Sequence, residues 1–199
     1  MYDCIYLESG VKLDIVDSTI EGFYLGRCVT AFGDINLIRS GVMNCGNGTV
    51  HGGGVKGCGG SRISIISSHF RNNIGEAGAA VEADSFSTLT ISHSKFSENV
   101  ATNTGAAIQA YWAASLFVKD TEFIQNESNT NGGIIEVFNT DAVVMDNTFL
   151  GNTAAGTDNV VRCGSYNRRQ HVLRYKGNNV GTEKIVRTPS YEECQMNWG

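Results

Sequence analysis

Short runs of alternating side chains recur along the chain. The clearest copies are Ile63-Ser-Ile65, Leu89-Thr-Ile91, Leu116-Phe-Val118 and Val143-Val-Met145, and weaker copies precede them at Leu13-Asp-Ile15 and Ile35-Asn-Leu37. A period of two is typical of a half-buried β-strand, whereas an amphipathic helix needs apolar residues at i, i+3, i+4 and i+7. No stretch keeps the helical spacing, so the sequence predicts an all-β protein.

Two motifs keep the same register as these runs. A phenylalanine precedes an asparagine by three residues four times, with the asparagines 26, 27 and 26 residues apart: Phe70 and Asn73, Phe96 and Asn99, Phe123 and Asn126, Phe149 and Asn152. A glycine motif stands 17 or 18 residues before the last three of these phenylalanines: Gly78-Ala-Ala-Val81, Gly105-Ala-Ala-Ile108 and Gly132-Gly-Ile-Ile135. A fixed period of this length indicates a repeat architecture, in which each unit packs on its neighbours.

The repeat predicts a parallel β-helix, that is, a coil of short parallel strands with three strands per rung. We expect six to seven rungs, which makes a cylinder roughly 30 Å long at the ~4.8 Å spacing of neighbouring strands. Residues 1–157 form the rungs in this prediction. Residues 158–199 form a degenerate last rung and a C-terminal cap of the same domain.

The repeat also predicts which polar residues point inward. The motif asparagines should form a structural ladder in which side-chain amides bond the backbone and the equivalent residue one rung away: Asn73, Asn99, Asn126 and Asn152. A second inward column is small and polar throughout: Ser18, Ser40, Ser68, Ser94, Thr121 and Asn147. Both columns are expected to be structural, because buried polar groups in proteins are almost always hydrogen-bonded.

The composition argues against two kinds of partner, nucleic acid and the membrane interior. Only 18% of the residues are charged and the net charge is −5, which argues against nucleic acid, because basic contacts dominate that binding. The chain contains no run of 18 apolar residues, so the sequence predicts no membrane span. The start, Met1-Tyr-Asp-Cys4, lacks the basic and apolar regions of a secretory signal, and no N-terminal cap is evident. We therefore expect a mature fragment, or part of a larger chain or assembly.

Six cysteines lie outside the most regular rungs, and none forms a C-x-x-C pair. Rung geometry favours a Cys4–Cys28 disulfide, because these residues lie about one turn apart. A Cys45–Cys58 bond would close a bend, and a Cys163–Cys194 bond would hold the C-terminal tail. Disulfides would place the protein in an oxidising compartment, so we expect an extracellular or cell-surface location. The alternative is six buried, reduced thiols, since free cysteine behaves as a small apolar residue.

The combination of the glycine motif with Phe-x-x-Asn resembles the repeat of chlamydial polymorphic outer-membrane proteins and of related right-handed parallel β-helix proteins. The resemblance covers about residues 52–157. Ala79 and Ala106 replace the second glycine of the family motif, and Ile134 replaces its alanine. Because the chlamydial proteins look like surface adhesins, the resemblance implies a right-handed, surface-exposed β-helix.

Two clusters are candidate sites. Five aromatic residues follow the glycine motifs at one bend of successive rungs and predict a ligand-binding strip: Phe86, Tyr111, Trp112, Phe138 and Tyr166. Alternatively, these rings cap the core. Asp120, Asp146 and His93 share one repeat position and are the best acid–base or metal candidates, with calcium as the ion. Against this, an aspartate at a bend commonly accepts backbone N–H bonds.

No arrangement of side chains predicts a catalytic residue. The leading hypothesis is therefore a non-enzymatic extracellular or cell-surface module that acts in adhesion, binding or surface structure, needs no cofactor, and has a carbohydrate or protein partner. The alternative is a lyase or hydrolase that acts on acidic polysaccharide, for which Asp120 and Asp146 would have to lie in an open groove.

Overall fold

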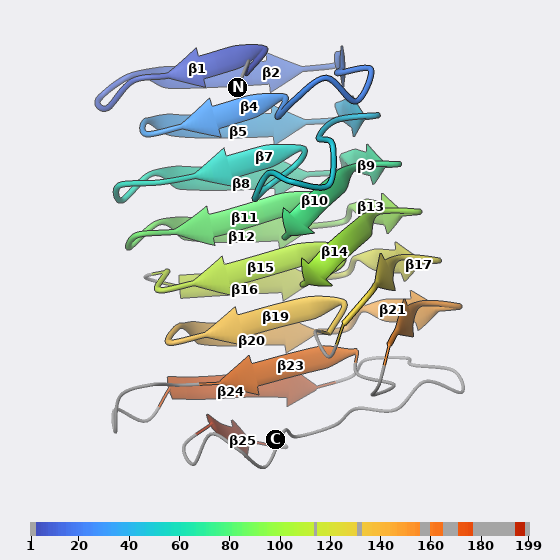
Figure 1. The fold of residues 1–199 in the computed structure, drawn as a ribbon. Coiled ribbons are helices and arrows are strands. Elements are labelled where there is room, and N and C mark those ends of the chain that lie inside the picture. The colour runs from blue at the N-terminus through green and yellow to red at the C-terminus, as the bar shows by residue number, and fades with distance from the viewer. Residues whose placement is uncertain are drawn as a thin grey trace.

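The chain folds as a parallel β-helix of about six turns in the computed structural model (Figure 1). The structure describes residues 3–113, 115–130, 133–155, 160–164, 171–176 and 194–197, with backbone alone at 164, 171–176 and 194–197. Every strand pair is parallel, and no helix interrupts the described part. No helix within these residues is long and apolar enough to cross a membrane.

Four parallel sheets form the walls of the coil. Sheet A contains seven strands: β1 (Ile5–Leu7), β4 (Val29–Ala31), β7 (Val55–Gly57), β11 (Val81–Asp84), β15 (Ile108–Tyr111), β19 (Ile135–Phe138) and β23 (Val161–Gly164). Sheet B contains eight: β2 (Lys12–Val16), β5 (Asp34–Ile38), β8 (Arg62–Ile66), β12 (Thr88–Ser92), β16 (Ser115–Lys119), β20 (Asp141–Met145), β24 (His171–Lys176) and β25 (Cys194–Asn197).

The other two sheets are narrower. Sheet C contains β3 (Thr19–Glu21), β6 (Gly41–Met43), β9 (His69–Arg71), β13 (Lys95–Ser97), β17 (Glu122–Ile124) and β21 (Thr148–Leu150). Sheet D contains β10 (Ile74–Ala77), β14 (Val100–Thr104), β18 (Glu127–Ser128) and β22 (Thr153–Ala154). Sheet D was not predicted, because its strands hold few apolar residues. Four rungs therefore carry four strands where the sequence predicts three.

Phenylalanines form the centre of the core. Phe70, Phe96, Phe123 and Phe149 are fully buried, and each ring stacks on the next with centroids 4.8 to 5.2 Å apart. The spacing of the rings is close to the interstrand spacing, because paired positions of sheet C place one phenylalanine on each of these four rungs. Each ring therefore covers a face of its neighbour and keeps water out of the coil.

The motif asparagines form an internal ladder. The Asn73 amide nitrogen donates to Asn99 Oδ1 at 2.9 Å and to the Val42 carbonyl at 3.0 Å, and Asn99 repeats this pattern with Asn126 and Phe70. Each Oδ1 also accepts the backbone N–H of the asparagine one rung earlier. The residue before each ladder position is left-handed, as at Asn72, Glu98 and Gln125. The amides thus satisfy backbone groups that the bend removes from the sheet.

The disulfide prediction was wrong for the N-terminal cysteines. Cys28 and Cys45 bond to each other, whereas Cys4 is an exposed free thiol and Cys58 a half-buried one. Cys45 occupies the ladder position of its rung, where its N–H donates to Asn73 Oδ1. Both bonded cysteines point into the same rung, so the bridge closes that rung from inside. Cys163 is also disulfide-bonded, and the side chain of its predicted partner, Cys194, lies outside the described residues.

Candidate binding groove on sheet A

A column of polar side chains runs along the outer face of sheet A. Successive strands pair the five residues of this column in register: Lys56, Glu82, Gln109, Glu136 and Arg162. Their neighbours in each strand, such as Val81 and Ala83, are buried in the core. Because side chains alternate across a strand, burying these neighbours forces one polar residue per rung onto the outer face.

These residues lie on the floor of a groove with a volume of about 530 Å³. Ala77, Asn103, Thr104 and His51 line it on the side where the strands begin, and Asp84, Tyr111 and Phe138 line it where they end. Sheet D folds toward this face through sharp bends at Gly78 and Gly105, which have φ of 54° and 63°. A Cβ on Gly78 would lie 2.6 Å from the Val81 carbonyl oxygen, so the glycine motif is what permits the bend.

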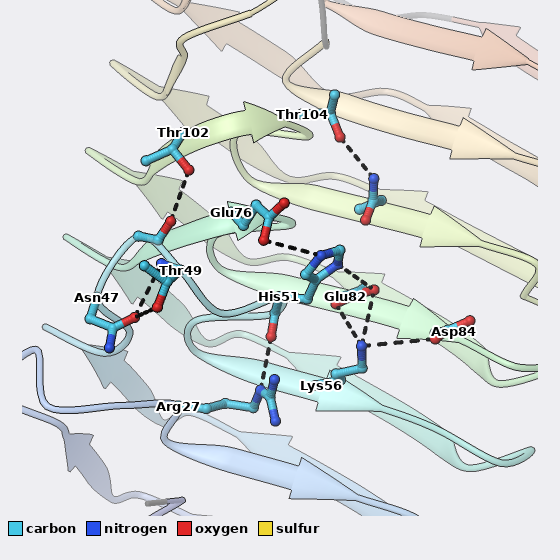
Figure 2. Close-up of polar contacts among 12 residues, drawn as sticks. Arg27, Asn47, Thr49, His51, Lys56, Glu76, Glu82, Asp84, Thr102 and Thr104 are labelled. Atoms are coloured by element: carbon cyan, nitrogen blue, oxygen red, sulfur yellow. Dashed lines mark hydrogen bonds and ion pairs between the residues drawn. The ribbon is translucent and has the colours of Figure 1, made fainter. Parts of the chain in front are cut away.

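Opposite charges are paired along the floor. Lys56 Nζ lies 3.2 Å from Glu82 Oε2 and 3.8 Å from Asp84 Oδ2 (Figure 2). Arg162 Nη1 lies 3.6 Å from Glu136 Oε1, and the Gln109 amide donates to Glu136 Oε2 at 3.2 Å. Only 3% of the Glu82 side chain is exposed, and its Oε2 accepts no hydrogen bond in the described structure. The groove therefore has a buried acceptor on its floor.

A glycine-rich loop, residues 46–54, forms part of the wall (Figure 2). Its His51 ring lies between two carboxylates, with Nδ1 3.3 Å from Glu82 Oε1 and Nε2 3.5 Å from Glu76 Oε2. The loop backbone is held independently, because Arg27 Nε donates to the His51 carbonyl at 2.8 Å and Thr102 Oγ1 to the Gly48 carbonyl at 2.9 Å. The loop is therefore held at two points of its backbone, Gly48 and His51.

The pKa values of two described histidines, His51 and His69, are shifted in opposite directions. The hydrogen bond to Glu82 raises the pKa of the His51 imidazole, and partial burial opposes this only in part. On sheet C, burial is the main cause that lowers the pKa of His69, and the charges of Lys95 and Arg71 add to it. In NMR titrations we therefore expect the His51 midpoint above about 6.5 and the His69 midpoint below it.

These shifts predict opposite effects on stability. The folded state holds the His51 proton more tightly than the unfolded chain, so this contribution is complete below about pH 6.5 and is lost as pH rises through the folded midpoint. For His69 the unfolded chain binds the proton more readily, so stability falls as pH drops below about 6.5. In melting measured as a function of pH, His51→Gln should remove the loss of stability at rising pH, and His69→Gln should remove the loss at falling pH. Midpoints in the reverse order would contradict both assignments.

The structure separates the predicted aromatic residues. Tyr111 stacks on Phe138 at 5.1 Å, and both line the groove. Trp112 meets the edge of Tyr111 but is a left-handed residue of the bend, with φ of 54°. Phe86 is 73% exposed at the same bend. The residue of its rung that pairs with Tyr111 is Asp84. Tyr166 lies outside the described residues. Of the four predicted aromatics that the structure describes, Tyr111 and Phe138 therefore share the groove.

The acidic candidates lie on a different side of the coil. His93, Asp120 and Asp146 occupy the bend between sheets B and C, in a column whose members all have φ between 48° and 55°: Asp17, Arg39, Ser67, His93, Asp120 and Asp146. His93 Nδ1 lies 3.9 Å from Asp120 Oδ2, beside Lys119 at 3.5 Å. A left-handed bend suits aspartate on conformational grounds alone. Among the described residues no three His, Cys, Asp or Glu are placed to hold a metal.

Sequence reasoning missed the polar floor of the groove. Its members differ in type and charge, so they do not read as a motif. Their spacing does carry a signal, because each is a polar residue inside an otherwise apolar strand, as in Val81-Glu-Ala83 and Ile108-Gln-Ala110, and they recur with the period of the repeat. A comparison with known proteins adds no assignment: no family model, curated protein or solved structure matches the chain.

Proposed function

We propose that the protein is a non-enzymatic binding module of the extracellular or cell-surface space, whose groove on sheet A holds a carbohydrate chain. The observation that carries this proposal is the continuous groove of about 530 Å³, with a polar floor and an aromatic wall. Concave sites that combine aromatic surface with a few well-placed polar groups are the usual form of ligand sites.

The repeat of the floor fits a repeating ligand. Polar groups stand about 4.8 Å apart from Lys56 to Arg162 over five rungs. A monosaccharide in an extended chain is close to one such spacing in length, so the groove matches roughly four sugar units along the coil axis. The half-exposed Tyr111, backed by Phe138, offers ring surface to the apolar face of a sugar.

The ion pairs on the groove floor favour a binding function over hydrolysis. An acid–base glycosidase needs one protonated carboxyl group and one carboxylate. Here Glu82 is held in an ion pair with Lys56 and Glu136 in one with Arg162, so both floor glutamates already have a partner of opposite charge. The location is supported by the Cys28–Cys45 disulfide, since such bonds persist in oxidising compartments.

Tyr111→Ala tests the proposal. In calorimetric titrations with a panel of oligosaccharides, we expect binding by the unmodified protein and a loss of about 2 kcal/mol, roughly thirtyfold, in the variant, as for a buried aromatic contact. Phe86→Ala is the matched control, because it removes an exposed aromatic at the same bend outside the groove. Equal loss in both variants, or binding by neither the protein nor its variants, would contradict the proposal.

A further inference from the structure

Both groove cations of the described residues are already neutralised. Lys56 is shared by Glu82 and Asp84, and Arg162 pairs with Glu136. The lining thus contains two cations against three carboxylates, which leaves one negative charge when His51 is neutral. A ligand that carries carboxylate or sulfate groups would have to break one of these pairs and leave a nearly buried carboxylate without its partner, which is strongly unfavourable.

Glu82 indicates which group a ligand should present to the groove floor. Its side chain is 97% buried, it lines the groove, and Oε2 accepts no hydrogen bond in the described structure. The nearby Lys56 lies 3.2 Å away without the alignment of a hydrogen bond to this oxygen. A buried acceptor of this kind is stabilised by a donor. Sugar hydroxyls donate, and a hydrogen bond to a carboxylate is about twice as strong as a neutral one.

We infer that the groove selects an uncharged glycan chain, with a hydroxyl donating to Glu82, and excludes acidic polysaccharides. This inference rests on the proposed carbohydrate function and specifies its ligand class. A cationic chain fits less well, because Lys56 and Arg162 already occupy the carboxylates that would attract it. The floor offers acceptors to a ligand, and its paired cations offer no compensation for added negative charge.

Matched ligands separate these classes. Titration calorimetry would compare neutral tetrasaccharides of glucose and N-acetylglucosamine with one charged counterpart each, the C6-oxidised glucuronate tetramer and the deacetylated glucosamine tetramer. We expect at least one neutral ligand to bind, and its charged counterpart to bind at least tenfold more weakly. Tighter binding of either charged form would overturn the inference but leave a carbohydrate groove in place. No binding in any arm would refute the proposed function itself.

Glu82→Gln tests the residue that the inference names. The change keeps the shape of the side chain, removes its charge, and leaves Lys56 with Asp84. We expect neutral binding to weaken about tenfold and the discrimination against glucuronate to shrink. Glu98→Gln is the control, because Glu98 lies at the bend after β13, where it forms an exposed ion pair with Arg71 outside the groove lining. Unchanged discrimination in Glu82→Gln, with folding verified by melting, would overturn the assigned role.

Discussion

Replacing Phe96 with alanine is expected to lower the free energy of unfolding by about 4 kcal/mol, the largest effect of any single substitution considered. Phe96 is fully buried, and both faces of its ring are covered, by Phe70 at 4.9 Å and by Phe123 at 5.2 Å. Alanine would leave a cavity that neighbouring rungs cannot fill, because the backbone ladders on both sides hold their spacing. Chemical denaturation measures the loss.

The melting temperature should fall by roughly 8–16 °C for a chain of this size. Phe86→Ala serves as the control, since Phe86 is 73% exposed, and its change should stay within about 0.5 kcal/mol. If Phe96→Ala were as mild as Phe86→Ala, the stacked phenylalanines would not be the core of the coil.

Removal of the Cys28–Cys45 disulfide is expected to cost about 3 kcal/mol, the value for a closed loop of this length. The two cysteines are 17 residues apart and fully buried. Gly22 lies directly against the bridge, where a Cβ would approach Cys28 Sγ to 2.6 Å. The double variant Cys28→Ala with Cys45→Ala, measured by chemical denaturation, should show this loss in full.

The repeat itself suggests how to recover part of that stability. Cys45 holds the position that Asn73 holds one rung later, and strand pairing aligns Cys28 with Ala80 two rungs later. Cys28→Ala with Cys45→Asn should therefore extend the asparagine ladder and regain about 1 kcal/mol relative to the double alanine variant. A lower stability than the double alanine variant would show that this position cannot accept a ladder amide.

The buried parts of the fold could be predicted because they repeat. Phe96 and Asn99 recur in type as well as spacing, since on four successive rungs a large ring fills the core and a side-chain amide satisfies the bend. The cysteines could not be placed the same way. Cys28 and Cys45 replace two different repeat residues, and their proximity depends on a closure within one rung that strand spacing does not reveal.

Sequence reasoning missed the groove for a related reason. Lys56, Glu82 and Gln109 share a register, but no packing constraint makes them alike. Sheet D also contributes a wall of the groove. Its strands, such as Val100–Thr104, lack the alternating apolar residues by which a strand is predicted from sequence. The position of Asp120 does recur along the chain, but what recurs there is a left-handed bend that also accepts Arg39 and His93. Repetition thus predicts packing well and binding surfaces poorly.

An NMR titration of the ¹⁵N-labelled protein with the neutral tetrasaccharide that binds best tests directly whether the groove is the binding site. We expect shift changes to concentrate on β11, β15 and β19, and the signal of the Gln109 side-chain amide, on the groove floor, to shift with them. Shifts confined to the bend that carries His93 and Asp120, or to the outer face of sheet B, would show that the groove on sheet A is not the binding site.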